Sequence, residues 1–253
     1  MMQVDDIIHN NGKTDMIIRE GRYYGYYVYG MQRTGTTLVE RVIADNWKIL
    51  MSNNLRMRDL PGVRPPSLDL DWKHHISIPH NLPENAPVVM IYKNPYTWIE
   101  SMLYRKGVAN GGWSQTHGET FNRRDQAYRK DDPQNGTTYT DNLLASYKAW
   151  FNTWLPYHDM NKDTSVIIKY EELLDPNKRM EIFCGIADKF GWPEFEFPQL
   201  TWANHVGSSQ PFTKTKQEYY LTGRPEQLNE MELQLVNTII GTDLIEKLGY
   251  NVL

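Results

Sequence analysis

The stretch that decides the fold runs from Arg22 to Asn46 and reads RYYGYYVYGMQRTGTTLVERVIADN. Its first eight residues are rich in aromatic and β-branched side chains that favour strands, and they end at Gly30. From Thr36 onward the pattern is helical, with an apolar stripe that consists of Leu38, Val39, Val42 and Ile43. The stretch therefore predicts a strand, a glycine-containing loop and a helix, in that order.

Strand-like and helix-like segments alternate through the rest of the chain. Short apolar strands are expected at residues 48–51, 88–92 and 166–168. Helices are expected at about 95–106, 141–158 and 176–190, with one or two more between 226 and 248. Such alternation is typical of a parallel sheet with helices on both faces. The sequence predicts an α/β fold: a single three-layer domain over residues 1–253, with a central parallel β-sheet flanked by helices.

Two polar segments interrupt this alternation. Residues 107–138 contain several glycines and exceed the length of an ordinary connection, which predicts a lid or substrate loop. Its tryptophan, tyrosine and arginine side chains suit a sugar, an aromatic ring or an anionic acceptor, although a run of charges is more often a solvated surface. Residues 204–226 are interpreted as a second polar loop.

Composition excludes several classes of protein. The chain has 27 Lys and Arg against 31 Asp and Glu, and a net charge of −4 argues against a nucleic-acid backbone as partner. The single cysteine, Cys184, excludes intrachain disulfides and thiolate metal clusters. Mean hydropathy is −0.63, no apolar run approaches the roughly 18 residues of a membrane helix, and the first residues are acidic. A soluble, cytoplasmic protein without a membrane partner is expected.

The segment Gly30–Thr37 is a candidate anion site. Backbone N–H groups and the helix dipole favour anions where a loop leads into a helix. The glycine spacing matches the ATP-binding P-loop, G-x-x-x-x-G-K-[ST], except that Thr36 stands where the lysine should be. The positive charge lies three residues earlier, at Arg33, whose planar guanidinium suits a shorter anion than a triphosphate. For the loop alone, an ordinary turn with a helix N-cap is the alternative.

This loop resembles the 5′-phosphosulfate loop of sulfotransferases, typically [KR]-[ST]-G-T-[TS] after a strand. Those enzymes use 3′-phosphoadenosine-5′-phosphosulfate (PAPS) as donor. The residues that carry the resemblance are Arg33, Thr34, Gly35, Thr36 and Thr37. Leu38 stands where the family has a tryptophan, and it is grouped with the donor-binding residues. The resemblance implies the P-loop-NTPase-like sulfotransferase fold and continues in order to about residue 190.

A second segment resembles the family's 3′-phosphate motif, in which a strand is followed by R-[ND]-P and, eight residues after the arginine, a serine. Here Lys93 replaces the arginine and Ser101 has the expected spacing. A cation at a strand end and a hydroxyl two helical turns later can reach one phosphate. The resemblance implies that Lys93 and Ser101 bind the 3′-phosphate. Lysine keeps the charge but loses the bidentate fork of arginine.

A third segment, Trp72–Ile76, resembles the K-[TS]-H-[LI] segment of cytosolic sulfotransferases, whose histidine is the general base. The match assigns Lys73 and His75 to the catalytic site. On an extended segment these two side chains share one side, so His74 is expected to face away. The alternative is a polar surface feature, and His80 is a second candidate base.

Two weaker matches complete the resemblance. Tyr170 begins a sequence similar to the family's Y-E-[DE]-L, which implies a place near the adenine, although a core tyrosine at a strand end is equally natural. The family's basic C-terminal loop, which closes over the 3′-phosphate, has no direct counterpart. Lys214 and Lys216, close to Tyr219 and Tyr220, are its nearest substitutes, so residues 204–226 become the expected cofactor-closing loop.

Together these segments imply in-line transfer of a sulfuryl group from PAPS to a hydroxyl or amine of a small-molecule or glycan acceptor, releasing adenosine 3′,5′-bisphosphate. Arg33, Lys73 and the loop N–H groups would stabilise the leaving oxygen, and His75 would take the acceptor proton. No metal is expected, because fixed cations take its place. Two alternatives stay open: a P-loop nucleotide or small-molecule kinase, and an inactive nucleotide- or glycan-binding relative.

Overall fold

The computed structural model describes residues 6–8, 16–19, 22–47, 49–51, 74, 76–79, 82, 84–103, 139–192 and 214–253. Contacts between residues divide the chain into two compact units. The first comprises residues up to Tyr92 together with Pro156–Phe212, and the second comprises Lys93–Leu155 together with Thr213–Leu253. A single domain over residues 1–253 stays a prediction.

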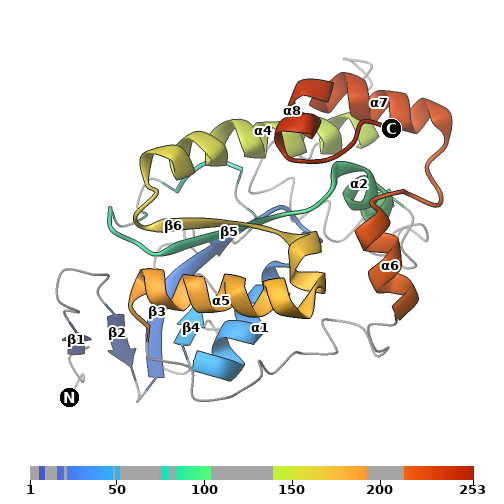
Figure 1. Ribbon diagram of the computed structural model, residues 1–253. Helices are drawn as coiled ribbons and strands as arrows, with labels where there is room; N and C mark the ends of the chain where they lie inside the picture. The colour runs from blue at the N-terminus through green and yellow to red at the C-terminus, as the bar shows by residue number, and fades with distance from the viewer. Residues whose placement is uncertain are drawn as a thin grey trace. The chain divides into compact units, whose positions relative to one another are not determined.

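A β-sheet is the centre of the first unit (Figure 1). Its strands are β1 (Asp6–Ile8), β2 (Met16–Arg19), β3 (Arg22–Tyr29), β4 (Ile49–Met51), β5 (Val88–Tyr92) and β6 (Ser165–Lys169). The order is β1-β2-β3-β5-β6, and β4 also pairs with β3. The pairs β3–β4, β3–β5 and β5–β6 are parallel, which confirms the predicted α/β class with its parallel sheet.

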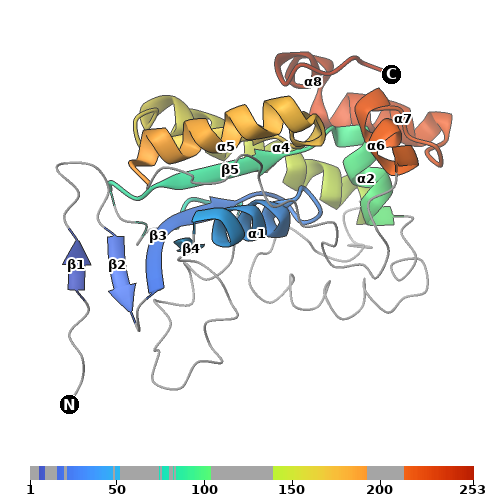
Figure 2. The same ribbon diagram turned by 60° about the horizontal axis from the view of Figure 1, so that its bottom comes forward.

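The sheet is not wholly parallel. Strands β1 and β2 pair antiparallel with each other, and β2 pairs antiparallel with β3 (Figure 2). These strands were not predicted, because three or four residues are too few to show a clear period. The predicted central parallel sheet therefore continues into an antiparallel edge that the sequence did not indicate.

The pairing of β3 with β5 places the glycine loop. The register joins Tyr27 to Val88 and Tyr29 to Met90, so both strands run in the same direction and end at the same edge. In open parallel sheets, ligands bind at the carboxyl ends of the strands. The loop that follows Tyr29 lies at such an edge, beside Ile91 of the neighbouring strand.

Helices α1 (Thr36–Trp47) and α5 (Pro176–Phe190) share one hydrophobic core with the sheet. Alternate strand residues reach this core, because successive side chains of a strand point to opposite faces. The strand residues are Tyr26, Val28, Val89, Ile91 and Ile168, and the α1 residues are the predicted stripe with Trp47. Helix α5 begins after Asp175, whose side chain accepts a hydrogen bond from the Asn177 N–H at 2.9 Å. The predicted strand–loop–helix order is confirmed.

The second unit is helical. It contains α2 (Pro95–Leu103), α6 (Lys214–Thr222), α7 (Glu230–Ile240), α8 (Thr242–Lys247) and most of α4 (Tyr139–Met160). Aromatic side chains form much of its core, and the Trp98 and Tyr147 ring centroids lie 4.7 Å apart. Within the described ranges, no helix is long and apolar enough to cross a membrane.

The structure describes part of one of the two predicted loops and none of the other. Residues 107–138 lie outside the described residues, as do residues 204–213. The rest of the second segment is not wholly a loop, because residues 214–222 form α6. Lysine, glutamine, glutamate and leucine in this stretch are good helix formers, and the helix ends before Gly223, which has a positive φ of 63°. The loop prediction is wrong for these nine residues.

Candidate functional site

Close approach of neighbouring groups fixes both glycines of the loop between β3 and α1. A Cβ atom on Gly30 would lie 2.5 Å from the carbonyl oxygen of Ile91, on the neighbouring strand. Gly35 has a φ of 104°, and a Cβ there would lie 2.7 Å from the ring of Tyr170. Both positions therefore require glycine, one for space and the other for space and conformation.

Hydrogen bonds inside the loop close a tight turn. The Thr34 N–H and hydroxyl both donate to the carbonyl of Met31, at 3.3 and 2.7 Å. Thr34 is fully buried, so its hydroxyl hydrogen serves the turn. The carbonyl of Gly35 then accepts from the N–H groups of Leu38 and Val39, at 2.9 and 3.1 Å, and this starts α1.

Arg33 lies in the left-handed backbone region with a φ of 67°, unlike every other non-glycine residue that the structure describes. For a residue with a Cβ atom, this conformation costs on the order of 1 kcal/mol. Such strain persists where the surrounding structure imposes it, and it is frequent at ligand-binding loops. The half-buried Arg33 adds a positive charge to the loop.

The start of α1 is suited to an anion. The first N–H groups of a helix have no acceptor within the helix, and the helix dipole is positive there. The first turn of α1, which begins with Thr36 and Thr37, has no acidic residue. The side chain of Leu38 belongs to the hydrophobic core and is 4% exposed. Its predicted contact with a donor stays a prediction, and the burial of this side chain does not favour it.

His74 contacts the glycine loop directly. Its Nδ1 lies 2.7 Å from the carbonyl oxygen of Gly30, which accepts a hydrogen bond when this nitrogen carries the proton. His74 lies in a turn, and its predicted position on the side opposite to Lys73 and His75 stays a prediction. Lys73, His75 and His80 lie outside the described residues.

Tyr170 begins the short 3₁₀ helix η3 (Tyr170–Leu174) after β6. Its ring lies against Gly35 and packs on the hydrophobic core. The structure thus brings Tyr170 to the glycine loop. On β5, burial, together with Glu172 and Glu171 of η3, raises the pKa of Tyr92 to about 12.

The second unit holds a group of residues that we call the Lys93 cluster: Lys93, Glu100, Ser101, Tyr219 and Tyr220. Two of them, Lys93 and Ser101, are predicted donor-binding residues. Lys93 is 2% exposed, and its Nζ lies 3.9 Å from the centroid of the Tyr220 ring. Its carbonyl accepts a hydrogen bond from the Tyr147 hydroxyl. A buried ammonium on an aromatic face is a favourable cation–π pair, so the lysine is held in place.

Helix α2 follows Lys93 directly. The Oδ1 atom of Asn94 accepts from the N–H groups of Tyr96 and Thr97, at 2.9 and 3.3 Å, and so caps the helix. Ser101 is 8% exposed and its hydroxyl donates to the carbonyl of Trp98 at 2.7 Å, which leaves its oxygen lone pairs as acceptors only. Its binding to a phosphate stays a prediction.

Lys214 and Lys216 lie in α6, but their side chains are outside the described residues. The end of the same helix carries Tyr219 and Tyr220, which join the Lys93 cluster. The cofactor-closing role of this segment stays a prediction, and its predicted loop conformation is wrong for residues 214–222.

Sequence reasoning missed Glu100. Its side chain is 4% exposed and accepts hydrogen bonds from the Tyr219 hydroxyl and from the N–H groups of Glu226, at 2.8 Å, and Gln227. Burial and the hydrogen bond to Glu100 raise the pKa of Tyr219 well above its usual value, which keeps the phenol protonated as a donor. The available signal was a charged residue inside a helix whose other side chains are all uncharged.

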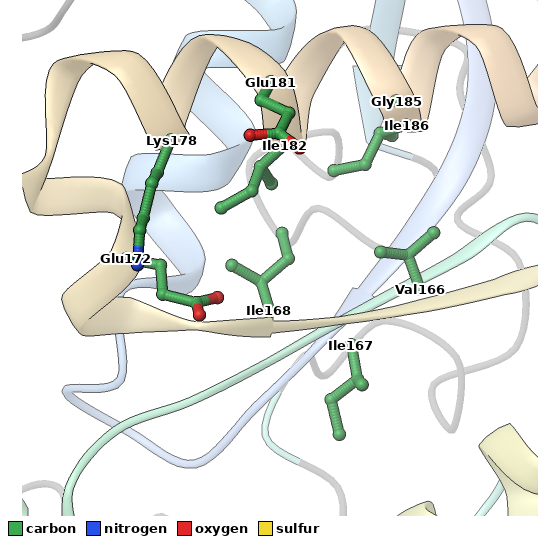
Figure 3. A pocket seen from close by; sticks show the side chains of 9 residues that line it. All are labelled: Val166, Ile167, Ile168, Glu172, Lys178, Glu181, Ile182, Gly185 and Ile186. Atoms are coloured by element: carbon green, nitrogen blue, oxygen red, sulfur yellow. The ribbon is translucent and has the colours of Figure 1, made fainter. Parts of the chain in front are cut away.

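The first unit also has a hollow of about 530 Å³ between β6 and α5 (Figure 3). Its lining consists of Val166, Ile167, Ile168, Glu172, Lys178, Glu181, Ile182, Gly185 and Ile186. Figure 3 shows Ile167 on the opposite side of β6 from Val166 and Ile168, as strand alternation requires. None of the predicted site residues lines this hollow.

Comparisons with protein-family models, with curated proteins and with solved structures find no match to this chain. No group of three or more His, Cys, Asp and Glu side chains that can hold a metal ion occurs in the part of the chain that the structure describes. The glycine loop and the Lys93 cluster are the two candidate parts of the site in the described residues.

Proposed function

We propose that this protein is a sulfotransferase that moves a sulfuryl group from PAPS to a hydroxyl or amine of a small-molecule or glycan acceptor. The observation that carries the proposal is the form of the glycine loop. Gly30 and Gly35 are fixed by close approach, the start of α1 offers N–H groups, and the loop's cation is Arg33 in a strained conformation. Thr36 stands where a triphosphate-binding loop has its lysine.

In the proposed reaction, the bond between sulfur and the bridging 5′-phosphate oxygen breaks while a bond from sulfur to the acceptor oxygen or nitrogen forms. Negative charge develops on the bridging oxygen, and Arg33, Lys73 and the N–H groups of residues 35–37 stabilise it. The acceptor proton passes to His75. Adenosine 3′,5′-bisphosphate is the other product.

The remaining assignments concern the nucleotide. Lys93 binds the 3′-phosphate, and burial of the Lys93 ammonium supports a strong interaction with a dianion. Ser101 also binds it, once its hydroxyl hydrogen turns from the carbonyl of Trp98 to the phosphate. Tyr170, beside the glycine loop, lies near the adenine, and Lys214 and Lys216 close over the 3′-phosphate. No metal takes part in the proposed reaction, and a cytoplasmic location stays a prediction.

Thermal unfolding with adenosine 3′,5′-bisphosphate, ADP and ATP, each with and without Mg²⁺, tests the donor site. A ligand present at a hundred times its Kd stabilises the fold by about 2.7 kcal/mol. We expect a metal-independent shift with the bisphosphate that is lost in Arg33→Ala. Arg41→Ala, which removes the same charge further along α1, is the matched control and should keep the shift.

Other outcomes of this experiment select the alternatives. A Mg²⁺-dependent shift with ATP and none with the bisphosphate would mean a kinase. A bisphosphate shift without sulfuryl transfer to any acceptor, in an assay with PAPS, would mean a nucleotide-binding relative.

The general base is tested by turnover. His75→Ala should lower kcat by about a hundredfold, the low end of general-base effects, while bisphosphate binding is unchanged. His80→Ala is the control, because His80 is the second candidate base. Loss of kcat in His80→Ala with normal kcat in His75→Ala would reverse the assignment.

A further inference from the structure

The segment Tyr219–Gln227 is attached at three points to α2 and to Asn94, the residue before it. At one end, the Tyr219 hydroxyl donates to Oε2 of Glu100. At the other end, the N–H groups of Glu226 and Gln227 donate to Oε1 of the same side chain. Between them, Gly223 lies so close to α2 that a Cβ atom would be 2.8 Å from Nδ2 of Asn94. One carboxyl group thus holds both ends of the segment.

The hydrogen bonds to Glu100 compensate the burial of its carboxyl group. A carboxyl group that is 4% exposed is costly unless hydrogen bonds replace its contacts with water, and here three donors do so. Two of the donors are backbone N–H groups, so they fix the path of the chain and not only a side chain. The segment that contains Tyr220 therefore has one position relative to α2.

The position of Tyr220 decides the surroundings of Lys93. The Tyr220 ring is 6% exposed and lies under the Lys93 ammonium, 3.9 Å from its centroid. Lysine has a flexible four-carbon stem and a compact charge, whereas arginine is a rigid fork. A ring at this distance restricts the conformations of the Lys93 side chain, so the ammonium group points in one direction.

We propose that Glu100 is a positioning residue, which holds the Tyr220 ring on Lys93 through Tyr219 and the backbone of Glu226 and Gln227, and so aims the Lys93 ammonium at a phosphate of the ligand. The inference rests on the proposed function only for the identity of that phosphate, the 3′-phosphate of the donor. The contacts among Glu100, Tyr219 and Tyr220 belong to the second unit by itself.

The first test needs no ligand. The rate at which an amine-reactive acetyl ester modifies Lys93 is measured by peptide mass spectrometry in the wild type, Glu100→Ala and Glu226→Ala. We expect Glu100→Ala to raise the Lys93 rate about tenfold, the equivalent of a lost buried cation–π contact. Glu226→Ala is the matched control, because this exposed side chain is truncated while its N–H group stays.

Two internal checks separate positioning from loss of structure. Lys148 donates to the carbonyl of Ile239 at 3.0 Å in the same unit, so its modification rate reports loosening of the whole unit and should not change. Glu100→Gln keeps an acceptor for the backbone N–H groups, and it should restore much of the Lys93 protection. If Glu100→Ala fails to fold, Tyr219→Phe, which removes one hydroxyl, takes its place.

The second test is the ratio of the Kd values for AMP and adenosine 3′,5′-bisphosphate, which isolates the 3′-phosphate. Glu100→Ala should lower this ratio about tenfold by weakening the bisphosphate alone. Tyr220→Leu should do the same, while Tyr220→Phe keeps the ring and should leave the ratio near the wild-type value.

The two proposals fail in different ways. A wild type that does not prefer the bisphosphate to AMP would contradict the proposed function, and Lys93 modification would still decide the role of Glu100. Unchanged Lys93 modification in Glu100→Ala, or equal acceleration at Lys93 and Lys148, would overturn the positioning role.

Discussion

The glycine loop is made almost entirely of backbone, whereas the Lys93 cluster is made of side chains. In the loop, residues 30–37 are consecutive, and two glycines and one internal turn give the chain its path. In the cluster, Glu100 reaches partners at residues 219, 226 and 227, more than a hundred positions away. A local, glycine-dependent feature can be found in a sequence, and a long-range polar contact cannot. The two regions should also respond differently to substitution.

The largest effect is expected in the loop, from one methyl group. Gly30→Ala would place a Cβ atom 2.5 Å from the backbone oxygen of Ile91, which cannot move without disturbing β5. We expect a loss of about 3 kcal/mol of unfolding free energy, measured in denaturant.

Gly185→Ala is the matched control for this prediction. A Cβ atom on Gly185 meets nothing within 4 Å, and alanine is the better helix former inside α5. The unfolding free energy should rise by about 0.5–1 kcal/mol. Equal losses in both variants would show that the close approach at Gly30 has no energetic weight.

A pH experiment tests the surroundings of β5, next to the loop. The pKa of Tyr92 is raised to about 12 by burial and then by Glu172 and Glu171. The unfolded chain releases this proton near pH 10, so the stabilisation is complete below pH 10 and is lost as the pH rises to 12.

The amount lost is about 2 kcal/mol. It is measured as the difference between unfolding free energies at pH 9.5 and pH 12 for the wild type and for Tyr92→Phe, whose curve should be flatter. Parallel curves would contradict the raised pKa. The wild-type fall includes other buried tyrosines, which the variant retains.

The cap of α2 tests the cluster side of the comparison. Asn94→Ala removes the acceptor for the N–H groups of Tyr96 and Thr97, and we expect a loss of about 1 kcal/mol in thermal or denaturant unfolding. Asn94→Asp keeps the acceptor and should restore most of the stability. A loss as large in Asn94→Asp would assign the effect to packing of the amide and not to the cap.

The smallest effect concerns the strain at Arg33. Glycine adopts a φ of 67° without a Cβ penalty, and alanine does not. Arg33→Gly should therefore be more stable than Arg33→Ala by about 0.5–1 kcal/mol in denaturant unfolding. Both variants lack the guanidinium, so both should lose bisphosphate binding. Equal unfolding free energies of Arg33→Gly and Arg33→Ala would mean that the backbone at position 33 leaves the left-handed region in the alanine variant.

Most of the fold could be predicted because its elements have local signals. The apolar stripe of α1, the continuous apolar run of β5 and the Asp175 cap of α5 each lie within a few consecutive residues. The short antiparallel strands β1 and β2 carry too few residues for a periodic signal. Helix α6 was hidden by its polar composition, which suits a helix and a loop equally well.

The candidate site could be predicted in part for the same reason. Loop spacing pointed to Gly30, Gly35 and Arg33, and the resemblance to sulfotransferases pointed to Lys93 and Tyr170, whose binding roles stay predictions. The contact of His74 with Gly30 depends on a turn that the alternation rule does not describe. The partners of Glu100 depend on tertiary packing, which one sequence does not reveal.

The buried tryptophans give each compact unit its own optical signal. Trp47 and Trp192 lie in the first unit, with ring centroids 6.2 Å apart, and Trp150 and Trp154 stack at the same separation in the second unit. Indoles that are packed this closely and held rigidly are expected to contribute to the circular dichroism of each unit. Trp→Phe replacements in one pair at a time would assign its contribution, and melting curves of these variants would then report the unfolding of each unit separately.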